Sequence, residues 1–348
     1  MNEALSNLAD DFFKNSLDSS PTSAIMRGYK EYFDQIEELT ETRFDQNLKD
    51  LDKFEKRLKE INFDNLSNKE KVTYGMLEYA FGSNKDSLLD KSWEFGAGVS
   101  GFTGYLIDYN QQMFIPDLES ADLLLKRLEL YNQFFNQVSS VQKKGLNENR
   151  VATERNLLRT IDQIESYLKT SLEEDPLLLV NFSPEVSEQD VSSWKNKAKL
   201  IIESHVRPSV NSYLEQLKSE HLPKGRSDTN PGIMWIDGGD DIYLRSLRKF
   251  TGNKDITVKE VHETGLSEIK RLKKEFFEIG KNVFADVTTP EEVIYKMQTE
   301  PSMRFESKEQ MLQMAEDIIK RAYEPLSDWF TVFPKAPCNV LPVPEESE

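Results

Sequence analysis

The sequence feature that most constrains the fold is an amphipathic run that begins at Val258. Apolar residues recur there mostly at intervals of three and four, the spacing of one face of an α-helix. They are Val258, Val261, Leu266, Ile269, Leu272, Phe276, Ile279 and Val283. At 3.6 residues per turn, the pattern describes a helix of roughly 25 residues. We expect this face to be buried, which requires other helices to pack against it.

Signals for further helices recur along the chain. Ser67 and Thr257 each begin a capping box, with a glutamate three residues later. We expect long helices over residues 120–145, 151–171 and 187–221, the last one interrupted near Pro208. Strand signals are scarce, and prolines between residues 325 and 344 favour an extended segment or an edge strand. The sequence therefore predicts an all-α fold, an elongated multi-helix scaffold with at most one or two short strands near the C-terminus.

The length of 348 residues allows a large core. Length alone would suggest two or three domains, but one extended helical domain is equally compatible with it. We expect residues 1–348 to form a single helical domain or a portion of a larger one. A sub-boundary is expected near residues 173–186, where a loop with an apolar centre separates helices.

The charge balance excludes several classes of partner. The chain has 61 acidic and 44 basic residues, a formal net charge of −17, which would repel nucleic acid and anionic membranes over most of the surface. Its one cysteine, Cys338, rules out an internal disulfide framework. The N-terminus has neither the basic nor the apolar segment of a signal peptide, and there are no 18 consecutive apolar residues. We therefore expect a cytoplasmic protein.

The histidines do not form a recognisable metal motif. A zincin helix carries two histidines at i and i+4 with a glutamate between them, whereas His205 and His221 are 16 residues apart, roughly 24 Å along one helix. His262 precedes Glu263, but the i+4 position is Leu266. We expect His262 to be a structural histidine at the edge of the core. No catalytic residue, metal ligand or cofactor is predicted for this chain.

Other catalytic signatures are missing or weak. The sequence has no Gly-x-Ser-x-Gly elbow and no P-loop. Gly96, Gly98 and Gly101 have dinucleotide-motif spacing, but no convincing strand precedes them. These glycines, with Gly104, would let two helices approach closely or let backbone lie against a ligand.

The stretch from Pro231 to Arg271 is the most distinctive part of the chain. Gly238 and Gly239 make a flexible turn, and an acidic pair follows that suits the first turn of a helix. The order of the Gly-Gly turn, Tyr243, Thr251-Gly252, Val261-His262 and Gly265-Leu266 resembles that of a bacterial family, domain of unknown function 885.

Members of that family look like zinc metallopeptidases, so the resemblance implies the N-terminal half of a zincin-like helical peptidase. Zinc is expected for a full-length relative, where a His-Glu-x-x-Pro-Gly-His-His motif follows a segment like 333–344, and relatives are exported or lipid-anchored. The present sequence contains no such motif. The resemblance therefore implies a cleft-forming portion of a peptidase or hydrolase, inactive alone, whose substrate is a peptide or small amide. The alternative is a non-catalytic helical module that binds a peptide or a protein.

Five residues in or near the distinctive turn are candidates for substrate binding, namely Arg226, Asp237, Gly238, Gly239 and Tyr243. A guanidinium can hold a substrate carboxylate, and a phenol can donate a hydrogen bond to a developing oxyanion. The alternative is that the aspartate and the glycines only form the turn and cap the helix that follows it.

Overall fold

The computed structural model describes residues 2–96 and 109–342. The chain separates into two compact units, Met1–Thr257 and Val258–Glu348, and each is described here by itself. Residues 173–186 lie inside the first unit. The glycine-rich stretch from Gly98 to Gly104 falls outside the described residues, so both interpretations of it stay open.

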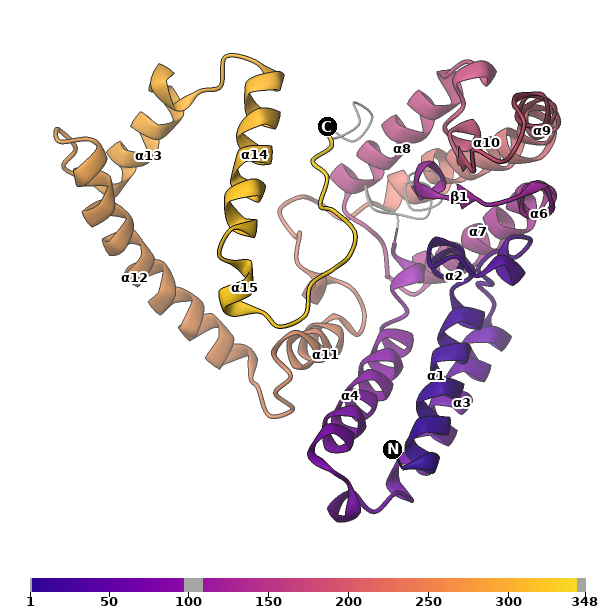
Figure 1. Cartoon of the computed structure of the whole chain (residues 1–348), viewed down its shortest axis with the longest axis horizontal. Helices are drawn as coiled ribbons and strands as arrows, with labels where there is room; N and C mark the ends of the chain where they lie inside the picture. The colour runs from indigo at the N-terminus through magenta and orange to yellow at the C-terminus, as the bar shows by residue number, and fades with distance from the viewer. Residues whose placement is uncertain (1, 97–108, 343–348) are drawn as a thin grey trace. The chain divides into compact units, whose positions relative to one another are not determined.

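The first unit begins with three helices that lie side by side (Figure 1). They are α1 (Glu3–Ser19), α3 (Glu41–Lys59) and α4 (Asn68–Asp90), with the short helix α2 (Pro21–Met26) after α1. Their shared core holds Phe12 edge-on against Phe54 and Phe81, with ring centroids 5.7 and 4.8 Å away. The predicted capping box at Ser67 is confirmed and fixes the start of α4. This bundle supplies two of the three helices around the pocket described below.

A larger group of helices completes the core of the first unit. It contains α6 (Leu118–Glu129), α7 (Tyr131–Asn147), α8 (Glu154–Lys169), α9 (Glu188–Ile201) and α10 (Arg207–Gln216). Their buried faces meet around Phe134, Phe135 and Tyr213. The predicted single helix over 120–145 divides at Leu130, between α6 and α7.

The expected interruption near Pro208 takes the form of a π-helical turn. Residues Ile202–Val206 adopt this wider turn immediately before α10, and Pro208 lies in the first turn of α10, where its missing amide donor is tolerated. A second π-helical turn, Leu217–His221, follows α10. The chain from α9 to His221 is therefore continuously helical and contains two π-helical turns.

The fold class is confirmed as mostly α-helical. The described strands are β1 (Phe114–Ile115) and β2 (Asn181–Phe182), which pair in parallel with Phe114 opposite Asn181. The sequence allowed at most one or two short strands near the C-terminus, and residues 331–342 form bends and extended backbone without strand pairing. Prolines remove the amide donors that such a ladder would need.

The second unit contains α12 (Val258–Val283), α13 (Pro290–Thr299), α14 (Lys308–Tyr323) and the short α15 (Leu326–Trp329). Helix α13 packs against α12 at Gly280, where an added Cβ would lie 2.5 Å from a methyl group of Val293. The expected burial of the α12 apolar face is wrong for the described structure. Leu266, Ile269 and Ile279 are 56%, 55% and 64% exposed, and Gly280 is the buried residue of α12.

None of the helices in the part of the chain that the structure describes is both long enough and apolar enough to cross a bilayer.

Candidate functional site

The predicted turn at Gly238 and Gly239 begins helix α11 (Gly239–Thr251). Gly238 adopts a left-handed conformation, with φ of +75°, which L-residues with side chains rarely accept. At Gly239 an added Cβ would lie 1.9 Å from the carbonyl oxygen of Ile233. Both glycines are therefore required by the backbone path itself. Their contact with a substrate remains a prediction.

Arg226 holds together the loop that leads into this turn. Its Nε donates to the Val151 carbonyl at 2.8 Å, and its Nη1 donates to the carbonyls of Asn230 and Gly232 at 2.9 and 2.8 Å. Burial lowers the pKa of this guanidinium. Arg226 thus fixes the start of the distinctive segment, and its predicted role with a substrate carboxylate stays a prediction.

Asp237 is also bound to its surroundings through two separate groups. Its Oδ1 accepts a hydrogen bond from Asn149 Nδ2 at 3.0 Å, and its carbonyl accepts one from Arg150 Nη1 at 2.8 Å. Tyr243 lies one turn into α11 and is 40% exposed. The structure therefore brings Asp237 and the two glycines together in one turn, with Tyr243 on the helix that the turn begins.

A buried ion pair that the sequence analysis missed anchors this turn. Arg150 Nε lies 2.7 Å from Glu94 Oε2, and the two side chains are 10% and 2% exposed. The same guanidinium donates to the Asp90 carbonyl at the end of α4 and lies over the ring of Phe95, 5.1 Å from its centroid. Arg150 therefore ties the end of α4 to the turn before α11.

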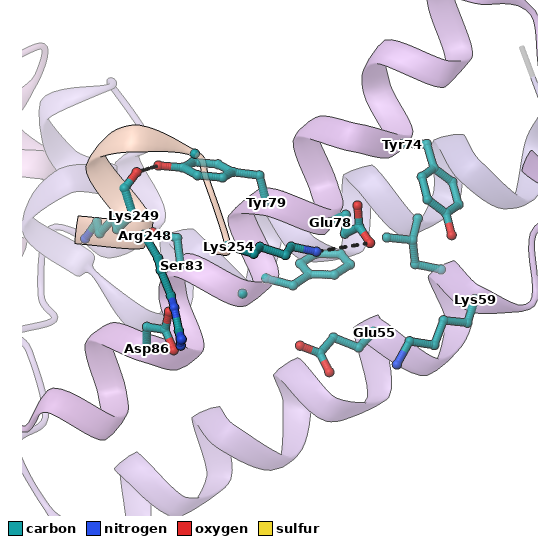
Figure 2. Close-up of a pocket in the computed structure, with 14 residues that line it drawn as sticks. Glu55, Lys59, Tyr74, Glu78, Tyr79, Ser83, Asp86, Arg248, Lys249 and Lys254 are labelled. Carbon is teal, nitrogen blue, oxygen red and sulfur yellow. Dashed lines mark hydrogen bonds and ion pairs between the residues drawn. The ribbon is translucent and has the colours of Figure 1, made fainter. Parts of the chain in front are cut away.

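A pocket of about 410 Å³ lies within the first unit, between α3, α4 and the C-terminal end of α11 (Figure 2). Its apolar lining includes Leu58, Tyr74 and Phe81. The charged side chains that line it are Glu55, Lys59, Glu78, Asp86, Arg248, Lys249 and Lys254. This combination suits a ligand that has both apolar and charged groups.

Three contacts hold the C-terminal half of α11 against α4. The Tyr79 hydroxyl donates to the carbonyl of Lys249 at 2.6 Å, and the Lys249 ammonium donates to Ser87 Oγ at 3.1 Å. Arg245 pairs with Asp90. These contacts place one wall of the pocket on the same helix that begins at the predicted turn.

The end of α11 brings a further charge to the pocket. Gly252 ends the helix in a left-handed conformation, with φ of +66°. The chain then turns so that Lys254 Nζ lies 3.8 Å from Glu78 Oε1 on α4 (Figure 2).

Burial raises the pKa of the Asp86 carboxyl, which also lines the pocket. Among its basic neighbours, Arg245 does most to lower this pKa.

The three histidines lie in different environments. His205 is exposed beside Ser204 Oγ, 2.8 Å from its Nδ1, and His221 is buried with its Nδ1 3.4 Å from the Gln216 carbonyl. His262 is exposed on α12, so its expected place at the edge of a core is wrong. Across residues 2–96 and 109–342, no three His, Cys, Asp or Glu side chains are grouped so that they could hold a metal ion. The described donor set therefore does not fit zinc.

The fold is that of a mostly α-helical protein, with a charged pocket between α3, α4 and the end of α11. A model of the family described as "Bacterial protein of unknown function (DUF885)" matches residues 21–348, and the chain belongs to this family. No curated protein matches the chain.

Among solved structures, the chain is similar to one titled as the putative lipoprotein from Colwellia psychrerythraea. The two share 17% sequence identity with a TM-score of 0.76. The match covers 93% of this chain and 58% of that chain, so this chain spans under three-fifths of the length of its structural neighbour. At this identity the likeness supports the fold.

Proposed function

We propose that this chain forms the substrate-binding part of a zinc-dependent peptidase or related hydrolase. The observation that carries the proposal is the pocket between α3, α4 and α11. One wall of that pocket belongs to the same helix that the family-like turn at Gly238 begins. Helix α11 thus carries both the turn that resembles the family and part of the proposed peptide-binding pocket.

A peptide is the substrate class that best fits the lining. Apolar rings and a leucine side chain offer a surface for an apolar side chain, and cations and carboxylates on the rim can pair with the polar ends of a short peptide. The volume of about 410 Å³ lies within the range of small-ligand pockets, roughly 300–1,000 Å³.

The role proposed for this chain is to bind and orient the peptide. The sequence has no His-Glu-x-x-Pro-Gly-His-His motif, and the described residues do not form a zinc site. The proposal therefore assigns the metal ligands and the general base of the complete hydrolase to residues outside these 348. No hydrolytic step is assigned to a residue of this chain.

The proposal is tested by measuring peptide binding, peptide hydrolysis and metal content on the same purified chain. Short peptides with an apolar residue should bind and be recovered uncleaved, and the chain should contain far less than one zinc. A Ser83→Trp substitution should block binding because Ser83 lines the pocket, whereas Ser192→Trp on an exposed position of α9 should not. One tightly held zinc per chain, or binding unaffected by Ser83→Trp, would contradict the proposal.

The second candidate is a non-catalytic helical module that binds a protein partner. It is favoured by the exposed apolar residues of α12 and α14, among them Leu266, Ile269, Met311 and Ile318. If this candidate is correct, a Leu266→Gln and Ile269→Gln double variant should lose partner binding. The Ser83→Trp variant should then retain it.

A further inference from the structure

From the charges around the pocket between α3, α4 and α11, we infer that it recognises the free C-terminal carboxylate of a peptide whose last residue is apolar. This inference rests on the proposed peptide-binding function and specifies the end of the peptide that is read. It concerns only residues of the first unit, from Glu55 to Lys254.

The first argument is a local reversal of charge. The chain as a whole carries an excess of 17 acidic groups. The pocket instead is lined by four basic side chains, Lys59, Arg248, Lys249 and Lys254, and by three carboxylates. An acidic protein that gathers an excess of bases around one pocket favours an anionic group there.

The carboxylates of the lining are partly neutralised by partners of their own. Glu78 lies 3.8 Å from Lys254, and Glu55 lies 3.5 Å from Lys85, which is not itself part of the lining. Asp86 lies beside Arg248 at one end of the pocket (Figure 2). The Glu78–Lys254 and Glu55–Lys85 pairs reduce the repulsion that an entering carboxylate would meet, and Lys59, Arg248 and Lys249 remain as cations around the pocket.

The C-terminus of α11 carries partial negative charge, which would repel a carboxylate, and one hydrogen bond reduces this effect. A helix C-terminus carries partial negative charge on its last carbonyl groups. The Tyr79 hydroxyl donates to one of them, that of Lys249, at 2.6 Å. Arg248 and Lys249 lie in the same last turn and add positive charge next to these carbonyls. The net field at this wall is therefore set by the basic side chains.

The apolar lining specifies the side chain that accompanies the carboxylate. Phe81 and Leu58 are buried, and the ring of Tyr74 lies at the opposite end of the pocket from Arg248 (Figure 2). A peptide whose carboxylate meets Arg248 or Lys249 would place its last side chain against Phe81 and Leu58. An aromatic or leucine side chain would bury apolar area there.

The test compares two peptides that differ only in their C-terminal group. Acetyl-Ala-Ala-Phe with a free carboxylate and its C-terminal amide are titrated into the full chain by calorimetry. The free acid should bind at least about tenfold more tightly, the effect of one charge-assisted hydrogen bond. Arg248→Gln should remove about that tenfold preference, so that acid and amide bind with similar affinity. Arg159→Gln, an exposed arginine on α8, is the matched control and should change neither.

Each other outcome has a distinct meaning. Equal binding of acid and amide, with Arg248→Gln changing neither, overturns carboxylate recognition while the proposed peptide-binding function stands. An equal loss in the Arg248 and Arg159 variants overturns it too, because the effect would then be one of overall charge. If neither peptide binds at millimolar concentration, both this inference and the proposed function fail.

Discussion

Replacement of Arg150 by methionine tests the buried junction that anchors the predicted turn. The substitution removes a guanidinium whose Nε lies 2.7 Å from Glu94 Oε2 and leaves that carboxylate, 2% exposed, without its cation. It also leaves the carbonyls of Asp90 and Asp237 without their donors. Breaking one partner of a buried ion pair lowers the free energy of unfolding by about 3–5 kcal/mol. We expect a loss in that range.

The assay is urea unfolding followed by tryptophan fluorescence, because Trp93 and Trp235 lie next to the junction in sequence. Arg159→Met on the exposed face of α8 is the control and should change stability by less than about 0.5 kcal/mol. Adding Glu94→Leu to Arg150→Met should recover part of the loss, since no buried charge is then left unpaired. A loss below about 1 kcal/mol, or no recovery in the double variant, would refute this account of the junction.

Three further predictions concern single positions. Gly239→Ala should lower the melting temperature clearly because its Cβ would meet the Ile233 carbonyl at 1.9 Å, whereas Gly265→Ala, with open space around it, should leave the melting temperature unchanged or raise it. Burial lowers the pKa of His221 below its usual 6.5, so stability should fall as pH decreases from 6.5 through the lower folded-state pKa. Urea unfolding at pH 7.5 and 5.5 should show a smaller difference for His221→Gln. Tyr243→Phe at the matching position of a catalytically complete relative should lower turnover without changing the melting temperature, and a loss of stability instead would support a purely structural role.

The helices that could be predicted are those whose ends carry local signals. The capping box at Ser67 forms as its sequence indicates and begins α4 at the expected place. The division at Leu130 has no such signal, because the residues around it are good helix formers and no glycine or proline interrupts them.

The turn at Gly238 was predictable, but the residues that hold it were not. Arg150 and Glu94 are 56 positions apart, and a single ion pair between distant residues leaves no periodic pattern in the sequence. The pocket leaves no periodic pattern either, since its residues come from α3, α4, α11 and the turn after α11, from position 55 to position 254. Periodicity identifies the face of a helix, whereas the partner of that face follows from the tertiary fold.

Helix α11 has a consequence for how members of this family can change in length. Its 13 residues make a rod of about 20 Å, with the turn at one end and the basic wall of the pocket at the other. Inserting or deleting one residue within it would rotate Arg248 and Lys249 by about 100° relative to Gly238, away from α4. We therefore expect length variation to fall in the loops on either side of α11 and to be selected against inside it.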